Sequence, residues 1–252
     1  MKHPRLWAAV LLVVLLLAWE WSAQAFHFSA LVLPAPSGVA AALWRALVTG
    51  YLWPHLAQTV IELLLGLTLG VVLGFAGGVL LGESAALRRL LMPYVVTSQV
   101  VPKLALVPLF IVWFGFGTVP TVVITALICF FPLLENTLTG VAQVDAARLE
   151  LFRMLGATRW QTLWRLKVPA GLPAILAGLR VAVVLALVGA VVGEFVGASK
   201  GLGALIIAAQ GSMDTPLMFA ALLVITVLGL LLYEITLLLE RHLLKPYFQP
   251  SN

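Results

Sequence analysis

Residues 141 to 173, VAQVDAARLELFRMLGATRWQTLWRLKVPAGLP, form a polar segment between two long apolar runs. Five of the fifteen Lys and Arg residues of the chain lie in it, against two acidic residues, so the segment must lie in water. Its apolar residues recur at intervals of three or four on either side of Gly156. This spacing predicts two short amphipathic helices joined at Gly156. The second is expected to end at Pro169, which has no amide hydrogen to donate, and Pro173 suits the first turn of the next helix.

Composition places the rest of the chain in a bilayer. Of its 252 residues, 62% are hydrophobic and 10% are charged, which leaves too little polar surface to coat a soluble globule. The formal charge of +5 does not indicate nucleic-acid binding, because the basic residues are dispersed between apolar spans. The single cysteine, Cys129, excludes an internal disulfide and a cysteine-cluster metal site, and no metal or other cofactor is expected.

Six apolar segments are each long enough to cross a hydrocarbon core of about 30 Å as a helix. The predicted spans are residues 6–22, 56–81, 92–113, 119–138, 174–196 and 216–239. A surface helix is expected over 39–49, in an extracytoplasmic connector. The first span admits a second interpretation, since its basic start and the Ala23-Gln24-Ala25 sequence also suit a secretory signal, whereas Trp19 and Trp21 suit a retained span.

Glycine and proline mark the second and third spans. Gly residues recur every fourth position through the second span, at 66, 70, 74, 78 and 82. We expect this face to pack closely against another helix, although a hinge is the alternative. Pro102 and Pro108 interrupt the third span, which predicts either a pathway-lining helix or a kinked packing helix.

The distribution of Lys and Arg predicts the orientation. Eleven of them fall on the side of residues 141–173, and two on the opposite side. By the positive-inside rule, both termini and residues 141–173 are cytoplasmic.

Charged residues within the spans need a partner or a water-filled cavity. Arg180 and Glu135 lie at similar predicted depths, so they are expected to form an ion pair or else to line the solute pathway. Lys103, near mid-depth, suits contact with an anion or a structural salt bridge. The residues assigned to the translocation pathway are Gln99, Lys103, Glu135, Arg180 and Glu194.

No catalytic residue is predicted. Residues 197–201, GASKG, fit the pattern of a nucleophilic serine, but they follow a predicted membrane helix rather than a strand. The chain also lacks the glycine-rich loop that binds ATP phosphates, so another subunit would have to hydrolyse ATP.

The spacing of Glu150, Gly156 and Val168-Pro169 resembles the Glu-Ala-Ala loop of permease subunits of bacterial ATP-binding-cassette importers. Three further stretches are similar to the nitrate, sulfonate and taurine branch of that family: LPAPSGV at 33–39, VPKLALVPLFIVWFGFG at 101–117 and GEFVGASKGLGALI at 193–206. Leu151 and Phe152 stand where the family pattern has two alanines, which bears on the fit to a particular ATPase.

This resemblance implies one all-α domain over 1–252, a MetI-like permease fold with six transmembrane helices and a cytoplasmic coupling loop at 141–173. It also implies a bacterial cytoplasmic membrane, a permease homodimer, two ATP-binding subunits and an extracytoplasmic solute-binding protein. Residues assigned to ATPase docking are Glu150, Arg153, Gly156, Ala157, Arg159 and Pro169. The two arginines would either contact acidic residues of the ATPase or only solvate the loop.

The expected function is therefore that of an importer permease for a small anion or organic solute such as nitrate, sulfonate or taurine. A vitamin precursor, pyrimidine or riboflavin, is the alternative substrate. Other classes are an ATP-independent secondary transporter or channel and a membrane anchor. As a separate alternative to a docking loop, residues 141–173 would be an interfacial loop whose charges contact lipid head groups.

Overall fold

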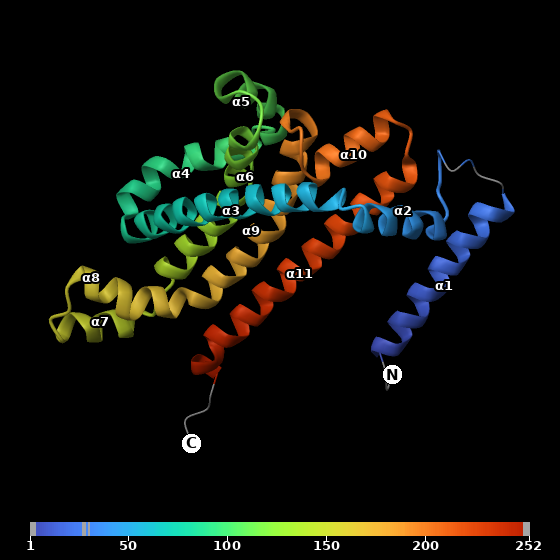
Figure 1. Cartoon of the computed structure of the whole chain (residues 1–252). Coiled ribbons are helices and arrows are strands. Elements are labelled where there is room, and N and C mark those ends of the chain that lie inside the picture. Colours follow the sequence, from blue (N-terminus) through green and yellow to red (C-terminus); the bar gives the residue numbers. More distant parts are fainter. Residues whose placement is uncertain (1–3, 27–28, 30, 249–252) are drawn as a thin grey trace. The chain divides into compact units, whose positions relative to one another are not determined.

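The structure, a computed structural model, describes residues 4–26, 29 and 31–248 (Figure 1). Every regular element within these residues is a helix, which confirms the all-α prediction. In chain order the elements are α1 (Pro4–Ala25), α2 (Pro36–Val48), α3 (Leu52–Glu83), α4 (Ala85–Val100), η1 (Lys103–Leu106), α5 (Val107–Phe114), α6 (Thr118–Ala142), α7 (Ala146–Met154), α8 (Arg159–Thr162), η2 (Leu163–Lys167), α9 (Val168–Gly197), α10 (Leu202–Gly211) and α11 (Thr215–Phe248).

Several of these helices are long and apolar enough to cross a membrane. Four stretches qualify alone: Leu52–Glu83, Thr118–Ala142, Arg159–Gly197 and Thr215–Lys245. A fifth consists of α4 with Lys103–Phe114, bent by 83°. The first predicted span falls within α1, whose described side chains are mostly apolar and exposed. The prediction of a polytopic helical membrane protein is confirmed, whereas residues 1–3 and 249–252 lie outside the described part and do not test the side of the termini.

The chain divides into two compact units. The first comprises residues 1–59 and 200–227. In it, Val39 and Ala42 of α2 pack against Ala220 of α11. The hydroxyl of Thr59 accepts a hydrogen bond of 2.8 Å from the amide of Leu202, at the start of α10. The predicted surface helix is thus α2, whereas α10 was not predicted.

The second unit comprises residues 60–199 and 228–252, and α6 runs between α3 and α9 at its centre. The glycines at every fourth position of α3 face α6, which confirms the prediction that they pack closely against another helix. A Cβ atom added at Gly74 would lie 2.6 Å from the carbonyl oxygen of Phe130, and one at Gly78 would lie 2.7 Å from that of Leu134. Bare backbone therefore lets the two helices approach closely enough for main-chain van der Waals contact.

A second set of glycines covers the other side of α6, and the sequence analysis missed it. Gly140 of α6 crosses Gly171 of α9 so closely that a Cβ on either would lie less than 3 Å from backbone atoms of the other. A Cβ at Gly189 of α9 would lie 2.9 Å from the Cα of Thr125, and one at Gly193 would lie 3.1 Å from the Cα of Thr121. The central helix is therefore held from two sides by main-chain contact.

The third predicted span is broken where its prolines stand. α4 ends at Val100, Pro102 is extended with φ −65° and ψ 95°, and Pro108 occupies the first turn of α5. Because proline cannot continue the hydrogen-bond ladder, the chain turns here instead of crossing as one rod.

The prediction that the helix after Gly156 ends at Pro169 is wrong. The helix continues from Arg159 to Gly197 without interruption. Just before Pro169, residues Leu163–Lys167 form one wide turn of π-helix. A proline ring normally clashes with the carbonyl group four residues earlier, and the wider turn makes room for it.

Candidate functional site

The predicted polar segment folds as a helical hairpin, α7 and α8, defined here as residues 145–162. Asp145 begins it, since its side-chain carboxylate accepts a hydrogen bond of 3.0 Å from the amide of Ala147. A carboxylate at this position satisfies a free amide and complements the positive end of the helix.

Gly156 ends α7 in a left-handed conformation, with φ +69°. The amide of Gly156 donates to the carbonyl of Arg153, and the amide of Ala157 donates to that of Phe152, each at 3.0 Å. This pair of bonds is the Schellman motif, which favours glycine at this position because a side chain disfavours positive φ. The glycine seen in the sequence pattern is thus required by the backbone of the turn.

Thr158 begins α8 with a reciprocal cap. Its hydroxyl accepts from the amide of Gln161 at 3.2 Å, and the side chain of Gln161 accepts from the amide of Thr158 at 2.8 Å. Such a capping box satisfies two otherwise free amides. Both helices of the hairpin therefore have fixed ends at the turn.

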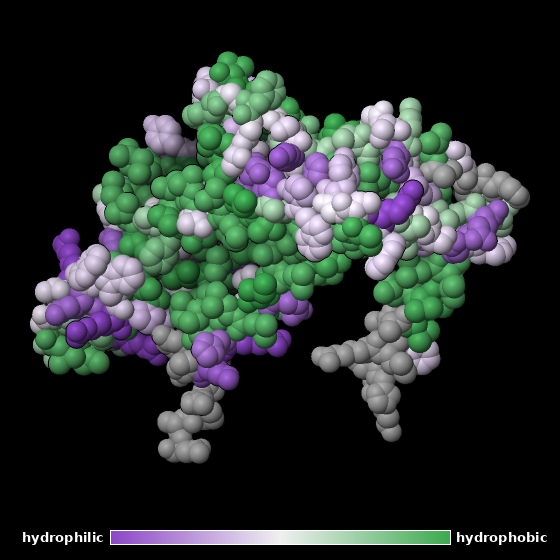
Figure 2. All heavy atoms as spheres, viewed as in Figure 1, coloured by the Kyte–Doolittle hydropathy of each residue, from purple (hydrophilic) through white to green (hydrophobic). Residues whose placement is uncertain are grey.

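The hairpin presents an open surface. None of the nine residues of α7, all of them described, is buried. Met154 is 82% exposed, Leu155 73% and Trp160 68%. Figure 2 shows hydrophilic side chains gathered over this end of the second unit and hydrophobic ones over its long helices. The exposed arginines of the segment form no ion pair with any described residue: Arg148, Arg153, Arg159 and Arg165. Exposed apolar side chains rimmed by charge are typical of a protein-binding surface.

Two contacts join the helix after the hairpin to α3. The ammonium of Lys167 donates to the carboxylate of Glu83 at 2.6 Å. Trp164 packs on Phe75, with ring centroids 6.2 Å apart. This link could not be predicted from the sequence, because nothing in the local pattern shows which helix Lys167 faces.

The predicted docking residues lie on or beside this hairpin. Glu150, Arg153 and Arg159 are exposed, and Ala157 is half-buried in the turn. Pro169 lies instead in the first turn of α9, beyond the π turn. We therefore expect it to set the path of the helix.

The structure brings Gln99 and Lys103 together at the break of the third span. The ammonium of Lys103 donates to the side-chain oxygen of Gln99 at 2.7 Å. Both line a cavity of about 410 Å³ whose walls include Ile128 of α6 and Val188 of α9. A cationic group that lines a cavity within the membrane can attract an anion.

The predicted ion pair between Arg180 and Glu135 is wrong. Arg180 pairs with Glu240 of α11 at 3.1 Å, and Glu135 is exposed on α6. The reason is angular: Gly178 faces α6, and a residue two positions later is turned by about 200° to the opposite side of α9. Depth in the membrane alone could not show this.

Glu194, the last predicted pathway residue, is 1% exposed in α9 and faces the helix packing. Glu62 of α3 is also fully buried. Buried carboxylates in membrane helices are costly and mark functional or structural polar contacts.

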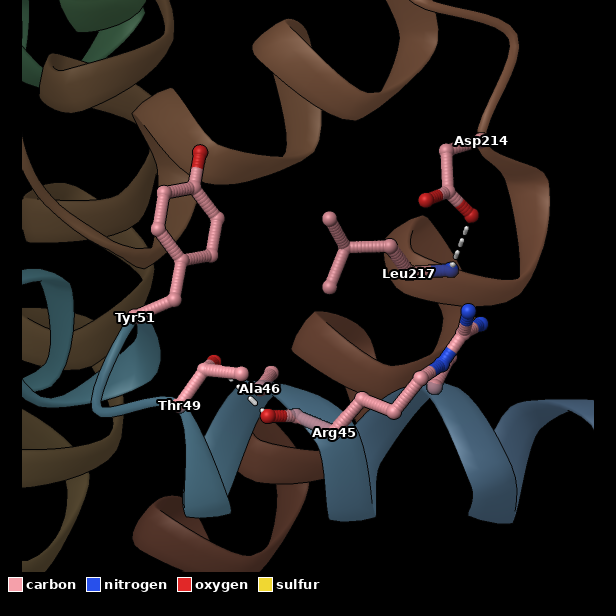
Figure 3. A pocket seen from close by; sticks show the side chains of 7 residues that line it. Arg45, Ala46, Thr49, Tyr51, Asp214 and Leu217 are labelled. Carbon is pink, nitrogen blue, oxygen red and sulfur yellow. Dashed lines mark hydrogen bonds between the residues drawn. The ribbon is translucent and has the colours of Figure 1, made fainter.

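The first unit carries a shallow pocket of about 180 Å³ between α2 and the start of α11. Figure 3 shows Arg45 extending from α2 toward the first turn of α11. There the carboxylate of Asp214 accepts from the amide of Leu217 at 3.1 Å, and Tyr51 lines the opposite wall. No role was predicted for these residues from the sequence.

Comparison with known proteins adds four findings. Residues 66–245 match the family described as the binding-protein-dependent transport system inner membrane component. The riboflavin transport system permease protein RibX of Chloroflexus aurantiacus is 39% identical over 97% of this chain and 91% of that protein. The taurine transport system permease protein TauC of Escherichia coli is 32% identical over 88% of this chain and 82% of that protein. A chain of the inward-facing MetNI methionine ABC transporter has the same fold, with a TM-score of 0.65 at 20% identity over 76% of this chain and 94% of that chain.

Proposed function

Because the chain belongs to the family of binding-protein-dependent transport system inner membrane components, we propose that its α7–α8 hairpin docks a separate ATPase that drives import. The chain is a permease of the ATP-binding-cassette class, and its role is transport. The hairpin supports the docking role because it is capped at both helix ends, exposed, and continuous with a membrane-spanning helix.

The contacts of the second unit suggest how docking would move the pathway. A shift of the hairpin is passed directly into α9, because no loop separates α8 from that helix. It is also passed to α3 through Lys167 and Glu83. Since α3 and α9 both contact α6 through bare backbone, the three helices would shift together.

The assembly we infer has two copies of one permease domain, two ATP-binding subunits and an extracytoplasmic solute-binding protein. In the cytoplasmic membrane of a bacterium, the hairpin and both termini would be cytoplasmic, where the excess of Lys and Arg lies. The pocket beside Arg45 would then face the binding protein.

Co-purification tests the docking role. The permease is expressed with its ATPase and recovered in detergent, with Glu150→Lys and Gly156→Trp as the disruptive variants. Lys200→Glu, an exposed charge reversal in the turn after α9, is the control. Loss of the ATPase from both hairpin variants and retention by the control is expected. Retention of the ATPase by all three variants would exclude docking at the hairpin. Uptake by the purified chain without ATP would exclude ATP-driven import.

The solute we infer is a small anion or organic molecule, such as nitrate, a sulfonate or taurine, or else a vitamin precursor such as a pyrimidine or riboflavin. The cavity with Gln99 and Lys103 supports an anionic group on the solute. In this proposal Glu135 and Glu194 also belong to the pathway, whereas Arg180, which pairs with Glu240 on the side of α9 away from α6, does not. Lys103→Met is expected to abolish uptake of an anionic solute while the ATPase stays bound. Unchanged uptake would remove Lys103 from the pathway.

A further inference from the structure

The last turns of the α11 span carry a cavity that the transport role does not use. Its volume is about 420 Å³, and it is lined by Leu237, Glu240, Arg241, Leu244 and Lys245. These positions follow the 3-4 spacing of a helix, so they form one stripe along α11. Leu244, 8% exposed, and the half-buried Leu237 give the stripe an apolar floor.

The charge of the cavity is positive. Its one carboxylate, Glu240, is neutralised by Arg180 of α9 at 3.1 Å. Arg241 and Lys245 are exposed and make no ion pair with a described residue. The two cations therefore face the opening without a counter-charge in this part of the chain.

The depth of the stripe in a membrane follows from the length of the helix. The span Thr215–Lys245 has 31 residues. At a rise of about 1.5 Å per residue it is about 46 Å long, some 15 Å more than the hydrocarbon core. Counted from Thr215, which follows the charged Asp214, about 20 residues suffice to cross the core, so residues 240–245 lie beyond it, at the level of the phospholipid head groups.

We propose that this cavity binds an anionic phospholipid, with its phosphate between Arg241 and Lys245 and an acyl chain along Leu237. The apolar floor favours a lipid over a free phosphate ion, because a phosphate ion gains nothing from contact with leucine. A bound lipid would also cover the Arg180–Glu240 pair and shield it from water, which strengthens the pair. The proposal requires only that α11 spans the membrane, so it does not depend on ATPase docking.

Lipid retention by the purified full-length chain tests the site. Phosphatidylglycerol, phosphatidylcholine or inorganic phosphate is titrated into the detergent-solubilised protein, and bound molecules are counted by native mass spectrometry. Each basic residue near a membrane surface contributes about fivefold to affinity for anionic lipid, so Arg241→Gln with Lys245→Gln should weaken phosphatidylglycerol binding by about 10- to 30-fold.

Two control variants show whether a loss of lipid binding comes from this site, from a general loss of positive charge or from misfolding. Arg88→Gln with Arg89→Gln removes two neighbouring cations of α4 and should leave the lipid bound. Arg241→Lys with Lys245→Arg keeps the charge and should also retain it. The proposal is overturned if the α11 glutamine pair binds phosphatidylglycerol as well as the unmodified chain does, or if the α4 pair loses as much. It is also overturned if phosphatidylcholine binds equally, or if millimolar phosphate displaces the lipid, which would make the cavity a free-anion site.

Discussion

Replacement of Gly156 tests whether the turn of the α7–α8 hairpin needs a glycine for its backbone or for space. A Cβ atom at this position would meet nothing within 4 Å, so the cost of a side chain comes from the φ angle of +69° alone. For alanine that cost is about 1–2 kcal/mol. Asparagine tolerates this conformation better, and a β-branched residue tolerates it worst.

The free-energy cost of a side chain at this φ angle limits how much ATPase affinity can be lost. A change of about 1–2 kcal/mol shifts the equilibrium between the capped hairpin and its alternatives about 5- to 30-fold. The apparent dissociation constant rises by at most that factor, since only the capped fraction binds. The measurement is ATPase binding to the permease in nanodiscs, for which we expect affinity to fall in the order Gly, Asn, Ala, Val.

The control is Gly38→Ala in α2, where a Cβ also meets nothing within 4 Å and φ is not positive. It should leave the affinity unchanged. If Gly156→Asn binds more weakly than Gly156→Ala, the order follows side-chain size. The glycine would then serve to fit a groove in the ATPase, and the backbone argument would be refuted.

Three further substitutions test the second unit. Gly74→Ala would place a Cβ 2.6 Å from a backbone oxygen of α6, so overpacking of about 1–3 kcal/mol should lower the melting temperature in detergent, and an unchanged value would contradict close packing. Reversal of either charge in the Arg180–Glu240 pair, which is partly exposed, should cost about 1 kcal/mol, and the double swap should recover it in thermal melts. Lys167→Glu should reduce ATP-driven uptake while ATPase binding persists, because it sets two carboxylates against each other at Glu83; full uptake would show that this link transmits nothing.

Features set by local sequence could be predicted. Apolar length gave the spans, and charge density gave the hairpin, since both depend on how each segment partitions between water and lipid. The row of glycines from Gly66 to Gly82 could be predicted to pack against another helix, because its spacing places it on one face of a single helix.

Features that depend on a partner helix could not be predicted from the sequence. The glycines of α9 that contact α6 are irregularly spaced, and Gly140 has meaning only because Gly171 crosses it. The partner of Arg180 depends on the rotation of α9 about its axis, which no composition reveals. The rule that proline ends a helix failed at Pro169. One wide π turn before it makes room for the proline ring, so the helix continues and keeps its packing.

The continuous helix Arg159–Gly197 determines how far its hairpin end must move for a given tilt. Its 39 residues give it a length along the helix of about 58 Å at 1.5 Å per residue. A tilt of about 5° pivoting at one end therefore carries the other end through about 5 Å, nearly a full helical pitch. The far end is held to the turn before α6, where the amide of Gly117 donates to the carbonyl of Gly197 at 3.1 Å. Because this end is held, a partner docked on the hairpin would have to move the hairpin itself through about 5 Å to tilt the helix by about 5°.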